Sequence, residues 1–125
     1  MDALKTAMQN KMSLDSSSMA LNSFNGRQNW GRIDKIGRMA MLFVQGRTDK
    51  VFSDNISYII SDNIARDFMP LSTQVFTVPR GNWENGTTNM LELVFSNNQL
   101  KVSPLYGDIP AGGYICFTIT YITQI

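Results

Sequence analysis

The sequence contains no histidine and only one cysteine, Cys116. Without histidine the chain lacks the commonest metal ligand and the usual general base, and Ser–His and Cys–His nucleophile pairs are excluded. A single cysteine excludes a disulfide within the chain, and its position in an apolar segment predicts a small buried side chain rather than a reactive thiol. We therefore expect no structural metal and no cofactor.

Carboxylate pairs remain as a formal route to hydrolysis, because two acidic side chains can share the work of acid and nucleophile. The second half of the chain offers Glu84, Glu92 and Asp108. The sequence does not place any two of them across a bond, and the chain has no acidic cluster of the D-x-D-x-D type. We interpret them as solvated charges and expect a protein that is not an enzyme.

Charge is also scarce: charged residues make up 17% of the chain and the net charge is +1. The most basic stretch, residues 27–50, also carries Asp34 and Asp49, so no basic surface for nucleic acid is indicated. No apolar run approaches the about 20 residues of a membrane span, and the N-terminus lacks the basic-then-apolar order of a signal peptide. Asn, Ser and Thr must cover much of the surface.

The first 28 residues differ from the rest and predict a helical neck or linker. Within "MDALKTAMQNKM", Leu4 and Met8 lie at helical spacing, which favours a short amphipathic helix. A helix of about 12 residues is marginal alone in water, so it needs partners. "SLDSSSMALNSFNG" follows as a Ser- and Asn-rich connector. A leader without a role of its own is the alternative interpretation.

From Trp30 the apolar pattern has a period of two, which predicts strands. In residues 39–44, bounded by Gly37 and Gly46, both faces are apolar, and the same holds for much of residues 114–122. "VFSDNISYII" and "STQVFTVP" predict further strands, and "MLELVF" and "LKV" flank "SNNQ" as a hairpin. Six or so short strands separated by turns indicate an all-β head at residues 29–125, an antiparallel β-sandwich of the jelly-roll kind.

Four segments carry a resemblance to a known family: "KIGRMAMLFVQG", "DFMPLSTQVFTVP", "NMLELVFSNNQLKVSP" and "IPAGGYICFTITYIT". Their order over residues 33–123 resembles the C-terminal β-sandwich heads of tail-fibre, baseplate and receptor-binding proteins of tailed bacteriophages, particularly those of Gram-positive hosts. Phe68 and Pro70 match a mid-domain aromatic and proline of that family, and Thr120 and Tyr121 match its closing strand. The Asn-rich loop around Trp83 departs from the pattern.

The resemblance implies a virion protein at the distal tail, made in the host cytoplasm without a signal peptide. It implies a homotrimer that contacts other tail or baseplate proteins and binds saccharide on the host cell surface. A purely structural trimerising component without receptor binding is the alternative, and a glycan-cleaving enzyme is a third. The Asn-, Ser- and Thr-rich surface is compatible with binding neutral hydroxyl groups.

Two loops carry the residues that we expect to contact the ligand. Trp83 lies in "RGNWENG" and Tyr106 in "PLYGDIPAGG", where an exposed aromatic ring would be free to stack on a sugar. The alternatives are a Trp83 that closes one end of the sandwich and an ordinary turn at Tyr106. The full set of predicted ligand-binding residues is Arg80, Asn82, Trp83, Asn85, Tyr106 and Asp108.

The strands with two apolar faces predict that one face is covered by the second sheet or by neighbouring subunits. We expect a homotrimer in which the N-terminal helices meet along Leu4 and Met8. On the head, Leu42 and Val44 are the predicted interface residues. The number three comes from the resemblance, because two heptads cannot specify it.

Overall fold

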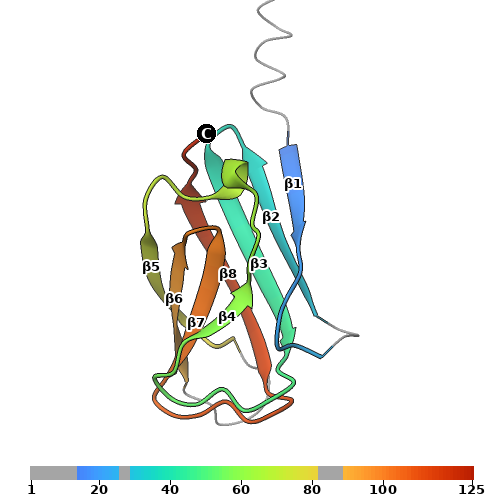
Figure 1. Ribbon diagram of the computed structural model, residues 1–125, viewed down its shortest axis with the longest axis vertical. Coiled ribbons are helices and arrows are strands. Elements are labelled where there is room, and N and C mark those ends of the chain that lie inside the picture. The colour runs from blue at the N-terminus through green and yellow to red at the C-terminus, as the bar shows by residue number, and fades with distance from the viewer. Residues whose placement is uncertain (1–13, 26–28, 82–88) are drawn as a thin grey trace, which may run out of the picture.

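Two four-stranded antiparallel sheets pack face to face in the computed structural model, which describes residues 14–25, 29–81 and 89–125 (Figure 1). The first sheet has the order β1 (Leu14–Met19), β2 (Trp30–Ile36), β3 (Met39–Arg47) and β8 (Tyr114–Ile122). The second has the order β4 (Tyr58–Ser61), β7 (Gln99–Leu105), β6 (Met90–Ser96) and β5 (Gln74–Pro79). The predicted antiparallel β-sandwich is confirmed.

The core lies between the sheets and is built by residues of alternate strand positions, as the period of two requires. On β3 the inward set is Ala40, Leu42 and Val44, all at most 3% exposed. The strands of the second sheet contribute their own inward set to the same core: Ile60, Leu91, Leu93, Phe95, Leu100 and Val102. One apolar face of β3 is therefore covered within a single chain.

Turn chemistry fixes the hairpins. Asn97 and Asn98 join β6 to β7 with φ values of 52° and 62°, a backbone conformation that asparagine tolerates better than most residues. This confirms the hairpin predicted at "SNNQ". Gly37, with φ 60°, turns β2 into β3, so the segment from Trp30 forms two strands. Of "VFSDNISYII", only its end belongs to a strand, β4, while Phe52 forms an isolated bridge with Ile109.

The boundary predicted at residue 28 is wrong, because residues 14–25 belong to the sandwich. β1 pairs along its whole length with β2, and Met19 and Phe24 reach the core. The sequence "LDSSSM" has too few apolar residues to show this, and its place in the sheet is set by backbone pairing. The helix predicted over residues 1–12 lies outside the described residues, and the described part contains one short 3-10 turn, η1 (Arg66–Phe68).

The sandwich has two distinct ends. At the upper end of Figure 1, β1 begins, β8 ends and the Asn97–Asn98 turn closes the hairpin. At the lower end lie the loops 48–57 and 105–113 and the end of β5. Because these loops all leave the strands at one end, they form a single surface far from the start of β1.

Candidate functional site

The structure brings two of the predicted ligand-binding segments together at the lower end. The side-chain amide nitrogen of Asn89 donates to the carbonyl of Gly107 at 2.9 Å, and the Arg80 backbone nitrogen donates to the Asn89 carbonyl. The end of β5, the start of β6 and the 105–113 loop are thereby joined. Three of the predicted residues, Asn82, Trp83 and Asn85, lie outside the described residues.

Arg80 is not a surface residue, contrary to the prediction, because it is only 2% exposed. Its Nε donates to the carbonyl of Tyr114 at 2.8 Å and its Nη1 to the Asn89 side-chain oxygen at 3.2 Å. A buried guanidinium needs such acceptors to offset the loss of water. Arg80 therefore ties the second sheet to β8 and positions the neighbouring loop instead of contacting a ligand directly.

Tyr106 is the most exposed aromatic residue in the part of the chain that the structure describes, at 77%. Its φ of 66° is unusual for a bulky residue. Backbone strain of this kind tends to occur at functional sites and is retained only where surrounding contacts hold it. The hydrogen bond from Asn89 to Gly107 supplies such a contact directly after Tyr106.

Asp108 is exposed as predicted, but one of its carboxylate oxygens has a structural partner. Oδ1 of Asp108 accepts a hydrogen bond from the backbone nitrogen of Asp54 at 2.7 Å. Next to it, Phe52 and Ile109 exchange two backbone hydrogen bonds of 2.8 Å each. The loops 48–57 and 105–113 are thus fixed to each other by hydrogen bonds, and this pair of loops is the rigid base that carries Tyr106.

Tyr114 and Cys116 lie near this end on the outer face of β8. Cys116 is half-buried, so it is less covered than the small buried side chain that the sequence predicted. Desolvation, followed by interaction with the Cys116 thiol, raises the pKa of the Tyr114 hydroxyl.

Leu42 and Val44 are not interface residues, because the second sheet covers them within one chain. Leu4 and Met8 lie outside the described residues. The exposed apolar surface of the first sheet is formed instead by four residues that are register partners across β1, β2, β3 and β8. We call it the apolar row; it consists of Leu14, Ile36, Met39 and Ile122, each 48–64% exposed.

A groove of about 380 Å³ lies beside three residues of this apolar row, Leu14, Ile36 and Met39, and Met41, Ala40 and Thr120 add to its lining. The only charged group in the lining, Asp34, is held by an ion pair with Arg32 at 3.0 Å and a hydrogen bond from Ser16. The Arg32 guanidinium also lies over the Trp30 and Phe43 rings. The outer face therefore changes from apolar at the upper end to polar and aromatic further down.

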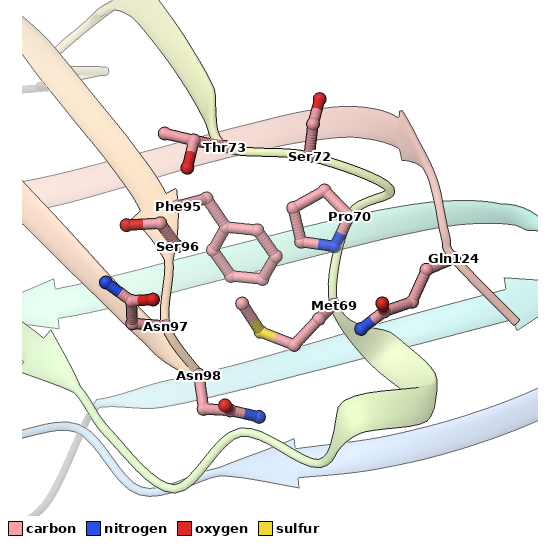
Figure 2. A pocket seen from close by; sticks show the side chains of 9 residues that line it. All are labelled: Met69, Pro70, Ser72, Thr73, Phe95, Ser96, Asn97, Asn98 and Gln124. Carbon is pink, nitrogen blue, oxygen red and sulfur yellow. The ribbon is translucent and has the colours of Figure 1, made fainter.

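A second pocket, of about 260 Å³, opens at the upper end beside the β6–β7 hairpin (Figure 2). Three segments that are distant in the sequence meet there: the loop after η1, the hairpin turn and the residue after Thr123. We call it the hairpin pocket; it is lined by Met69, Pro70, Ser72, Thr73, Phe95, Ser96, Asn97, Asn98 and Gln124. Sequence analysis identified the "SNNQ" turn but assigned it no site, since nothing local indicates its neighbours.

Among the described residues, no three His, Cys, Asp or Glu side chains gather as a metal site. Within the same residues, no helix is long and apolar enough to cross a membrane. We compared the chain with known protein families, curated proteins and solved structures, and none of these comparisons found a match.

Proposed function

We propose that this protein is the attachment head of a tailed bacteriophage, a virion protein of the distal tail that binds saccharide on the host cell surface. It acts without catalysis, as a homotrimer bound to other tail or baseplate proteins. The lower-end loops make the contact with the cell. The proposal combines the resemblance of residues 33–123 with the placement of Tyr106.

The packing of the motifs that carry the resemblance supports it. The hydroxyl of Tyr121, in the closing strand, donates to the carbonyl of Phe68 at 2.6 Å, although the two residues are 53 positions apart. Pro70 forms a bridge with Thr123 directly beside it. The mid-domain motif and the closing strand therefore form one structural unit, as expected if they belong to a common domain pattern.

The observation that carries the proposal is the exposed Tyr106 ring on a rigid base at the end opposite the start of β1. A phenol ring offers an apolar face for the C–H face of a sugar, together with one hydroxyl for hydrogen bonding. Rigid loops lower the entropy cost of binding. A head held through its N-terminal side presents this end outward.

Adsorption of virions to host cells tests the proposal. Purified protein in excess should slow adsorption of the virions that carry it, since it occupies the same receptors. The Tyr106→Asn protein should block virion adsorption several-fold less well than the wild type, because the substitution removes the ring while asparagine tolerates the positive φ. Val75→Ala is the matched control: Val75 is 60% exposed but lies on β5. No slowing by the wild-type protein, or equal loss in both variants, would contradict attachment through the lower end.

A structural component without receptor binding is the second candidate, and the apolar row favours it. Four large apolar side chains that all lie half-exposed on neighbouring strands form the kind of surface that subunit contacts cover. In this case copies of the chain assemble through the row, and another protein binds the receptor. Intact assembly without any effect on adsorption would favour this candidate.

A further inference from the structure

We propose that the hairpin pocket is a binding site for a small neutral polyhydroxylated ligand, such as one sugar residue of a saccharide. This ligand class is the one that the proposed function needs, and to that extent the inference rests on it. The site itself is new: it lies at the end opposite Tyr106 and contains none of the ligand-binding residues predicted from the sequence.

The chemistry of the lining selects for hydrogen bonding without charge. Of the nine lining residues, six carry a hydroxyl or a carboxamide and none is ionisable at physiological pH: Ser72, Thr73, Ser96, Asn97, Asn98 and Gln124. Hydroxyls and carboxamides both donate and accept, which matches the mixed character of sugar hydroxyls. An anion or a cation would find no opposite charge in this lining, whereas a neutral polyol would find several partners.

Three of these side chains are available for a ligand. Thr73, Ser96 and Asn97 form no side-chain hydrogen bond with any other residue in the part of the chain that the structure describes. Thr73 and Asn97 are exposed, and in Figure 2 Thr73 lies above the buried Phe95 ring and Asn97 to its lower left. Donors and acceptors that converge on one concavity are typical of a ligand site.

The remaining polar groups hold the pocket in shape. Nδ2 of Asn98 donates to the Ile64 carbonyl at 2.8 Å, and the Gln124 backbone nitrogen donates to the Met69 carbonyl at 3.2 Å. Leu71 is in turn bonded through its backbone nitrogen to the Ile122 carbonyl at 3.0 Å. All three segments of the pocket are therefore fixed to neighbouring backbone before a ligand arrives, which favours binding.

The size and shape of the pocket limit the ligand and its affinity. A volume of about 260 Å³ is near the lower end of the range of ligand pockets, so a single ring fits better than a chain. Phe95 and Met69, at 0% and 5% exposure, form the base of the pocket, so the polar side chains at its rim would make the contacts with the ligand. For a ligand of about 12 heavy atoms we expect a Kd on the order of 1 mM. The pocket lining and the apolar row share no residue.

Amide chemical shifts of the ¹⁵N-labelled full chain, titrated with methyl glycosides of glucose, galactose, N-acetylglucosamine and rhamnose, test the inference. At least one of these neutral glycosides should shift the amides of residues 72–73 and 96–98 with saturation near 1 mM. Glucuronate, which is charged, should bind no more tightly than the neutral glycosides. Thr73→Val/Asn97→Gly should weaken binding about tenfold, since it removes a hydroxyl and an amide while glycine keeps the turn. Val51→Ala, at an exposed position of the 48–57 loop, is the control and should leave this Kd unchanged.

Absence of saturable shifts at these residues with every neutral glycoside would overturn the site, as would an unchanged Kd in the double variant. If the double variant does not fold, Thr73→Val alone, which changes no backbone preference at the turn, must weaken binding at least twofold. The two proposals fail separately. Glycoside binding in the pocket without any slowing of adsorption refutes the attachment function alone, and slowed adsorption without pocket shifts refutes the pocket alone.

Discussion

Tyr121 connects the closing strand to the turn η1 through a single hydroxyl. Its ring packs against Phe95 in the core, at 5.1 Å between centroids, and its hydroxyl donates to the Phe68 carbonyl. Burial raises the pKa of this phenol well above its ordinary value of 10.0. A raised pKa means that folding favours the neutral phenol. The stability that Tyr121 contributes through this group is therefore fully present below pH 10 and is lost as the pH rises beyond it.

Tyr121→Phe should therefore lower the free energy of unfolding by about 1 kcal/mol at pH 7, because a buried hydrogen bond is lost and the Phe68 carbonyl loses its donor. The difference between wild type and variant should shrink above pH 10, where only the wild type loses stability through this group. Urea unfolding at pH 7, 9 and 10.5 measures both effects. A difference that stays constant to pH 10.5 would contradict the assigned role of burial.

Single residues also show where sequence analysis failed. Arg80 resembles an exposed loop residue in "PRGNWENG", because charged residues next to glycine and asparagine usually face water. Its burial depends on acceptors at Tyr114 and Asn89, which only the folded chain brings within reach. The exposure of Tyr106 agrees with its local sequence, since the glycine and proline residues around it already indicate a turn.

Among the elements, the junction of β5 with β8 holds the two sheets together at the lower end. The Cys116 backbone nitrogen donates to the Arg80 carbonyl at 3.0 Å, and Gly81 follows directly. Gly81 has φ +71°, and a Cβ there would lie 2.0 Å from the Cys116 carbonyl oxygen. Only glycine permits this approach, because both the backbone conformation and the space exclude a side chain.

Gly81→Ala should therefore lower the free energy of unfolding by at least about 3 kcal/mol, because alanine is strained at this positive φ and its Cβ would collide with the Cys116 carbonyl oxygen. Gly112→Ala is the matched control, because Gly112 has φ +79° but nothing within 4 Å of an added Cβ. This variant should lower the free energy of unfolding by only about 1 kcal/mol, because only the backbone strain of alanine at positive φ is added. Chemical unfolding of both variants gives the comparison, and equal losses would mean that the close contact at Cys116 does not hold the sheets together.

The elements that sequence analysis found are those with a strong local signal. β3, β5 and β8 are rich in apolar and β-branched residues between turn signals, and the β6–β7 hairpin contains turn asparagines, so their pattern is visible without the fold. β1 has no such pattern and was assigned to a linker, since its pairing with β2 depends on backbone hydrogen bonds. The hairpin pocket was missed for the same reason: its three segments meet only through tertiary structure.

For the whole molecule, the apolar row explains why β3 and β8 have two apolar faces. One face meets the second sheet, and the other exposes Met39 and Ile122 beside Leu14 and Ile36. We predict that copies of the chain cover this row in a homotrimer. Light scattering should give about three times 14.1 kDa at micromolar concentration.

Ile36→Lys/Met39→Lys should dissociate the trimer, because it places two charges in an interface that has no partner for them. Val75→Lys, at an equally exposed position of β5, is the control and should leave the mass unchanged. A wild-type monomer, or a double variant that keeps the trimer mass, would show that the row is not the contact between subunits.

The central claim is that this head attaches to saccharide on a cell surface, and the most direct measurement is binding of the labelled wild-type protein to bacterial cells by flow cytometry. The bacterial strains tested include the host on which the virions are grown. We predict saturable labelling of that host, competed by unlabelled protein, reduced several-fold by Tyr106→Asn, and lost after periodate oxidation of the cell-surface sugars. Absence of saturable labelling on the host, or labelling that survives periodate unchanged, would contradict the claim.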